Sequence, residues 1–192
     1  SVEDQSIVKE QYFGEDEFGG KPQMTKFKTK LPNGNIGMVF APIGGGGYKK
    51  IQDDNPLNWT YIEINPYEVK LEKSIAFQAP ASVWAINSVS VAGEDVFIYG
   101  PTNDKKNDKY TNLVPDNGKY NGYSIVKFSG NSLAWVKTTN MNEFADKLKT
   151  PPGQQKAPEF TGKKFVMGDF VVGSSGDIFV NGQNLKVKDG QN

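Results

Sequence analysis

Hydrophobic residues in this chain gather in short stretches that are rich in β-branched and aromatic side chains, and they rarely recur at helical spacing. Such stretches are typical of β-strands, and clusters of Gly, Asn, Asp or Pro separate each one from the next. The stretches recur in the same order, in sets of four. The first set covers residues 24–31, 36–43, 59–65 and 69–78. The second covers 84–92, 95–99, 123–129 and 132–138, and a third begins with 165–172, 177–181 and 185–188.

One segment departs from the strand pattern and predicts a short helix over residues 141–149. Phe144 and Leu148 share one face at helical spacing. Asn140 can cap the first turn together with Glu143, three residues further on.

The second strands of the three sets align as residues 37–42, 96–101 and 178–183, and a tight turn precedes each of them. A four-stranded antiparallel unit of about 45–60 residues is the signature of a β-propeller blade. The predicted fold is therefore all-β, with antiparallel four-stranded repeats, two complete and a third in part. A β-sandwich or a barrel is the alternative arrangement of the same strands.

Two features of the repeats point to a family. A glycine run, 44–47, follows the second strand at Ile43, and Trp135 follows a turn after a third strand. In this pattern the chain resembles β-propeller repeats, most nearly those of the kelch type, over residues 24–188. The resemblance implies sheets that pack face to face against neighbouring sheets.

The repeats suggest how the chain is divided. Residues 1–23 form an N-terminal segment, in which 6–13 can add a strand and the acidic, glycine-rich stretch 14–20 serves as a connector. Residues 24–192 form the β-repeat domain. Because propellers usually need at least four blades to close, we expect this domain to be part of a longer protein. Alternatively, its open sheet edges pair with another chain.

The connections between the expected strands differ in length. In a four-stranded blade the first and third connections leave one face, and here they are tight. Those on the opposite face include three long connections, 44–58, 101–122 and 139–164. Long loops on one face are where function concentrates, so we expect the binding site there. The alternative is that they are tolerated insertions.

Composition excludes several kinds of chemistry. All 22 basic residues among the 192 are lysine, and the chain contains no Arg, His or Cys. A zinc finger, a thiolate nucleophile, a disulfide framework and a Ser-His-Asp triad are therefore excluded. The formal net charge of zero argues against nucleic acid as a partner. No apolar run reaches the roughly 20 residues of a transmembrane helix.

The start of the sequence bears on localisation. The chain begins at Ser1 rather than Met and carries no signal-like apolar stretch. Together with the absence of Cys, this favours the mature form of an extracytoplasmic bacterial protein, either secreted or periplasmic.

Polar and aromatic residues in or beside the long connections are the candidate ligand-binding or partner-binding residues. They are Tyr48, Asp53, Asp54, Trp59, Asp104, Asp108, Tyr110 and Tyr120. Oxygen-rich loops of this kind can hold Ca²⁺, but the spacing from Asp104 to Asp108 matches no EF-hand, so we expect solvated turns and no cofactor. Trp59 and Tyr120 can instead be the first buried residues of their strands.

These observations favour a non-catalytic, exported β-repeat scaffold that binds a protein or a glycan through its long-loop face. The first alternative is a carbohydrate-active hydrolase with an Asp/Glu pair, because carboxylates are the only strong acid/base groups present. The second is a structural module that self-associates through its open edges.

Overall fold

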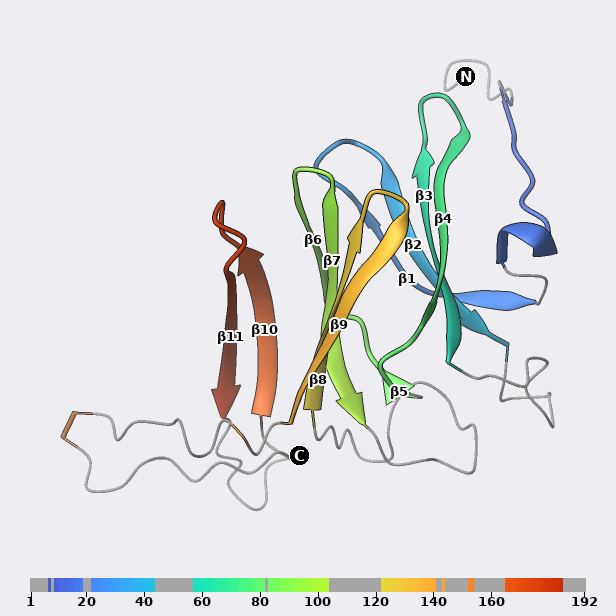
Figure 1. Ribbon diagram of the computed structural model, residues 1–192. Helices are drawn as coiled ribbons and strands as arrows, with labels where there is room; N and C mark the ends of the chain where they lie inside the picture. The colour runs from blue at the N-terminus through green and yellow to red at the C-terminus, as the bar shows by residue number, and fades with distance from the viewer. Residues whose placement is uncertain are drawn as a thin grey trace. The chain divides into compact units, whose positions relative to one another are not determined.

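The computed structural model describes residues 7, 9–18, 22–43, 57–81, 83–103, 122–140, 143, 152–153 and 165–184 (Figure 1). These residues form eleven β-strands and one short 3-10 helix, so the predicted all-β fold is confirmed. The chain divides into two units, Ser1–Gln78 and Ala79–Asn192.

The first unit is a four-stranded antiparallel sheet in the order β1-β2-β3-β4. Its strands lie within one residue of the predicted bounds, because tight turns rich in Asn, Gly and Pro mark their ends. The central strand β3 is buried on both faces from Trp59 to Glu63. The strands are β1 (Gln23–Lys30), β2 (Ile36–Pro42), β3 (Asn58–Asn65) and β4 (Lys70–Gln78).

An N-terminal segment accompanies this sheet. Residues 9–13 have no regular secondary structure, and the 3-10 helix η1 (Glu15–Phe18) lies within the predicted connector. The Ser74 hydroxyl of β4 donates to the Glu17 carbonyl at 2.7 Å, and the Lys9 ammonium donates to the Glu68 carbonyl. These two bonds attach the segment to β4 and to the turn before it.

The second unit contains a five-stranded antiparallel sheet. Strands β5, β7, β8 and β9 follow one another, and β6 also pairs with β7, on the same edge as β5. The strands are β5 (Val83–Trp84), β6 (Ser88–Ala92), β7 (Asp95–Asn103), β8 (Gly122–Ser129) and β9 (Ser132–Asn140). The sequence predicted one strand over 84–92, and the structure divides it into β5 and β6.

The division follows from a close backbone approach at Gly100. The Ala85 carbonyl oxygen lies 1.9 Å from the position that a Cβ on residue 100 would take, which only glycine allows. On either side of this point the ladder continues, since the amide of Ala85 donates to Pro101 and that of Asn87 to Tyr99. Strands β5 and β6 therefore act as one irregular edge strand, and the Trp84 indole N–H donates to the Gly100 carbonyl at 3.2 Å.

The third predicted repeat is represented by a hairpin of β10 (Phe165–Val172) and β11 (Ile178–Asn184). The expected continuation over 185–188 lies outside the described residues. In the turn, the Gly173 amide donates to Asp177 at 2.8 Å and the Gly176 amide to Gly173 at 2.9 Å. Gly176 has φ +85°, a conformation that glycine adopts without strain.

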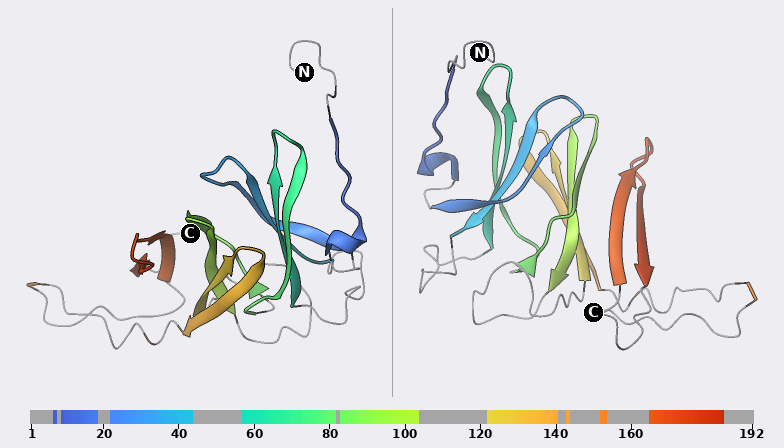
Figure 2. Two further views of the ribbon diagram at one scale, coloured as in Figure 1. Left: turned by 45° about the horizontal axis from the view of Figure 1, so that its top comes forward. Right: turned by 180° about the vertical axis from the view of Figure 1, so that it is seen from behind.

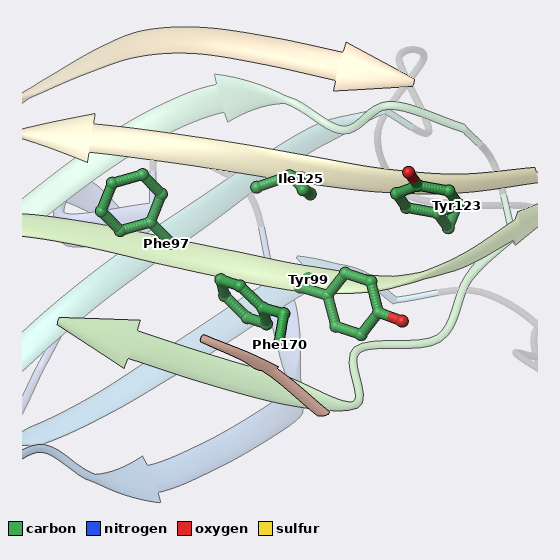
Figure 3. Packing of buried hydrophobic residues seen from close by; sticks show 5 residues of the cluster. All are labelled: Phe97, Tyr99, Tyr123, Ile125 and Phe170. Atoms are coloured by element: carbon green, nitrogen blue, oxygen red, sulfur yellow. The ribbon is translucent and has the colours of Figure 1, made fainter. Parts of the chain in front are cut away.

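One face of this hairpin packs against the five-stranded sheet. Phe170 of β10 enters a buried cluster with Phe97, Tyr99, Tyr123 and Ile125 (Figure 3). The rings of Tyr99 and Phe170 are 5.0 Å apart at 47°, and those of Tyr99 and Tyr123 are 6.0 Å apart at 61°. Four further apolar residues surround the cluster: Ala92, Val172, Ile178 and Val180.

The strand ends agree with the predicted grouping of connections. Strands β7 and β9 are parallel to each other, since both are antiparallel to β8. The C-terminal ends of β7 and β9, at Asn103 and Asn140, therefore lie at one end of the sheet, and the turns β6–β7 and β8–β9 lie at the other (Figure 2). In the first unit, the β2–β3 connection likewise leaves the end opposite the two tight turns.

The structure describes little of the predicted helix over 141–149. Within that range only Glu143 is described, and its carboxylate accepts a bond from the Asn140 amide at 3.3 Å. This is the contact that a capping box requires. The rest of the predicted helix lies outside the described residues, and among the described residues no helix has the length and apolar character needed to cross a membrane.

No closed barrel forms among the strands that the structure describes. The antiparallel sheets of the first two predicted repeats are confirmed, with four strands in the first unit and five in the second, where β5 and β6 share one edge. The choice between a propeller and a sandwich stays a prediction, as does the kelch-like resemblance.

The approach at Gly100 gives a testable prediction. Gly100→Ala should lower the free energy of unfolding by about 3 kcal/mol, because the new methyl group meets a carbonyl that the ladder holds in place. Urea denaturation followed by tryptophan fluorescence measures this. Gly173→Ala is the control, since its φ is not positive and the nearest atom, on the Phe179 ring, lies 3.4 Å away. Equal effects of the two substitutions would contradict the close backbone approach at Gly100.

Candidate functional site

Only one of the residues predicted from sequence to form a site is described by the structure. Trp59 lies in β3 with 3% of its surface exposed, which agrees with the buried role left open as its alternative. The others lie outside the described residues: Tyr48, Asp53, Asp54, Asp104, Asp108, Tyr110 and Tyr120. Their proposed role in binding stays a prediction.

The first unit contains a buried carboxylate, Glu63 of β3, which is 2% exposed. The side-chain amides of Asn33 and Asn35, in the β1–β2 turn, donate to its Oε1 at 3.0 and 2.7 Å. On Oε2, the Lys73 ammonium of β4 lies at 3.4 Å and the Tyr61 hydroxyl donates at 3.4 Å. The carboxylate therefore holds the turn to two strands.

These contacts fix the protonation state of the cluster. Burial alone raises the pKa of Glu63, but the hydrogen bonds from Asn35 and Asn33 and the charge of Lys73 outweigh it, so its pKa lies below the usual 4.5. Burial, together with the Glu63 charge, raises the pKa of Tyr61. At neutral pH Glu63 is ionised and has no proton to donate. Its arrangement supports the fold and does not suit a general acid.

The second unit exposes large apolar side chains on its outer strands. Strand β9 lies at the edge of the sheet, and nearly all of its residues are exposed. Three of them are large and apolar: Leu133 at 36%, Trp135 at 36% and Val136 at 40%. Exposed tryptophan on a sheet edge is a feature of binding surfaces more than of solvated strands.

Trp135 is held in place by residues of neighbouring strands. Its ring meets that of Phe97 edge-on, with centroids 6.1 Å apart and planes at 63°. The Lys127 ammonium lies 5.4 Å from the centroid of Phe97 and 2.6 Å from the Asp95 carboxylate. Because Phe97 pairs with Lys127 and Lys127 with Trp135, the three side chains share one face of the sheet.

We call this surface the Trp135 platform. Lys137, two residues after Trp135, lies on the same face and is exposed. The platform comprises Asp95, Lys127, Trp135 and Lys137, and the Trp135 ring contacts the buried Phe97 ring edge-on. It combines a rigid ring with two lysines and one carboxylate, which suits recognition of a partner and offers no activated nucleophile.

Sequence reasoning identified Trp135 only as a repeat feature and placed the site in the long loops. The platform instead lies toward the tight-turn end of the sheet, three residues beyond Ser132, where β9 begins. Its members come from three strands between residues 95 and 137, and only the strand register brings them together. The sequence did contain one signal for this surface. Trp135 falls on the last strand of a predicted set, and Lys127 falls on the strand before it.

Metal-binding clusters are absent from the described part of the chain, where no three His, Cys, Asp or Glu side chains come together as ligands. The chain matches no protein-family model, and no curated protein or solved structure matches it. Function therefore has to be inferred from the residues themselves.

The Glu63 cluster predicts a pH-dependent stability. Because the folded-state pKa of Glu63 is lowered, its contribution is present above about pH 4.5 and is lost as the pH falls through the folded-state value. Glu63→Gln should lower the free energy of unfolding by about 2 kcal/mol at pH 7, and the difference should shrink below pH 4. Denaturant titrations at both pH values measure it.

Glu72→Gln is the matched control. Glu72 also pairs with a lysine, Lys70, at 3.4 Å, but both side chains are substantially exposed. Its loss should cost at most a few tenths of a kcal/mol. A Glu63→Gln effect that is the same at both pH values would show that the carboxylate charge is not what stabilises the turn.

Proposed function

We propose that the protein is a non-catalytic β-repeat scaffold that binds a partner protein through the Trp135 platform. The observation that supports this is the exposed Trp135 ring, braced on Phe97 beside the Lys127–Asp95 ion pair. A tryptophan that is already ordered loses little side-chain entropy when a partner covers it. Tryptophan is accordingly enriched at the residues that dominate binding energy.

The charges around the ring suggest the chemistry of the partner. Lys127 is neutralised by Asp95, whereas Lys137 has no ion pair among the described residues. A partner that places an apolar side chain on Trp135 and a carboxylate near Lys137 would match the platform. We therefore expect an acidic protein segment with an apolar anchor.

The other functional expectations from the sequence remain predictions. A glycan remains the alternative ligand, because flat rings beside polar groups also suit sugars, and the long-loop face remains an expected surface. For the hydrolase, the described ion-paired carboxylates offer no support, since Glu63 and Asp95 are each bound to a lysine. Export stays a prediction.

Peptide selection tests the proposal. Peptides selected from a random display library against the immobilised chain should carry an apolar residue beside Asp or Glu. Trp135→Ser should weaken their binding at least about tenfold, which corresponds to 1.4 kcal/mol. Titration calorimetry of the selected peptides measures the effect, and circular dichroism checks that the variant folds.

Tyr67→Ser is the control, because Tyr67 is 81% exposed and lies in the first unit, away from the platform residues in sequence and sheet. It should leave peptide affinity unchanged. A glycan array run in parallel decides between ligand classes. Peptides that bind Trp135→Ser as well as the unaltered chain, or binding confined to glycans, would overturn the proposed partner.

A further inference from the structure

The β10–β11 hairpin is a sheet of two strands, whereas the other two sheets among the described residues have four and five. One of its faces is packed against the five-stranded sheet through Phe170. On its other side, the outer edge of β11 has no strand beside it among the described residues (Figure 1). Two-stranded sheets are marginal in water, so an added strand would stabilise this one.

The turn shows which backbone groups lie on that edge. The bond from the Gly173 amide to Asp177 marks these two residues as a hydrogen-bonded pair. Hydrogen-bonded and non-hydrogen-bonded pairs alternate along an antiparallel ladder, so the pairs that contain Ile178 and Val180 are non-hydrogen-bonded. The N–H and C=O groups of Ile178 and Val180 therefore point away from β10, toward the open edge.

Charge distinguishes this edge from the outer strands β1, β4 and β9. The β5–β6 edge is uncharged as well, but β10 lies beside β6. Proteins protect exposed edges with charged residues, lysine above all, and with bulges. The outer strands β1, β4 and β9 each carry charge: Lys26, Lys28 and Lys30 in β1, Lys70, Glu72 and Lys73 in β4, and Lys137 in β9. The pairings of β1, β4 and β9 each contain a register shift, and so does the β10–β11 pairing. Strand β11 contains no charged residue at all and begins with three apolar ones.

The exposed face of the hairpin is also apolar. Val171 and Phe179 are cross-strand partners, and their side chains are 63% and 65% exposed. They lie opposite the face that carries Phe170 and Val180 into the cluster. An uncharged edge beside an apolar pair has the properties of a pairing strand, and the register shift of this hairpin, between Met167 and Phe170, lies outside residues 178–180 of β11.

We propose that β11 pairs antiparallel with β11 of a second copy of this chain. The two hairpins then form one antiparallel sheet in the order β10-β11-β11-β10. This sheet has four strands, the same number as the sheet of the first unit. A two-fold axis through the β11 pair makes the contact self-complementary and closed. It brings the two Phe179 side chains close together, while the Val171 side chains remain a strand further from the axis on each side. The contact uses none of the Trp135 platform residues and is independent of the proposed function.

Molar mass in solution is the first test. Sedimentation equilibrium should give a concentration-dependent mass that approaches twice 21.2 kDa. Phe179→Lys places two positive charges beside each other across the axis and should raise the dissociation constant of the dimer at least about tenfold. Val171→Lys adds the same charge on the same face, about 4.8 Å further from the axis on each side, and should have a clearly smaller effect.

Amide hydrogen exchange tests the edge itself. Protection of the Ile178 and Val180 amides should rise with protein concentration in the unaltered chain and be absent in Phe179→Lys. Because Phe179 is largely exposed, this variant should keep the circular dichroism spectrum of the unaltered chain. A monomer at all concentrations up to about 0.5 mM would overturn the proposal. So would a dimer that Phe179→Lys leaves intact, or one that Trp135→Ser dissociates.

Discussion

Strand β7 carries large apolar side chains on both faces, and the second unit depends on covering them. Val96, Phe97, Ile98 and Tyr99 are each at most 3% exposed, although successive residues point to opposite sides. Burying side chains of this size stabilises the fold by about 1.5–3 kcal/mol each. A single sheet cannot cover both of its own faces, so a second layer is required. The β10–β11 hairpin supplies this layer on the face that carries Tyr99. The hairpin in turn depends on that contact, since two strands alone have little stability.

Much of this fold could be predicted from the sequence, because local signals determine it. The tight turns mark the strand ends, and the uninterrupted apolar run of residues 96–99 is typical of a strand buried on both faces. The division of β5 from β6 could not be predicted, because it depends on which residue pairs opposite Gly100. Strand β7 also continues past Pro101 to Asn103, since the carbonyl of that proline still accepts a ladder bond from Ala85.

The candidate site was harder to predict than the fold. The expected residues were chosen from long connections, where composition is the only guide, and all but Trp59 lie outside the described residues. The platform instead draws Asp95, Lys127 and Trp135 from three strands. Each is ordinary in its own sequence context, and only the register makes them neighbours. With lysine as the only cation and no His or Cys, the proposed recognition would rest on shape, aromatic contact and single charges.

The Glu63 cluster has a consequence for how the first unit can change in evolution. One carboxylate accepts bonds from Asn33 and Asn35 of a turn and meets Tyr61 and Lys73 of two strands. Any one partner can be replaced only if the others still compensate the buried charge, so their substitution effects should be strongly non-additive. Among related sequences, these positions should vary as a group: a turn that loses its asparagines should also lose the glutamate.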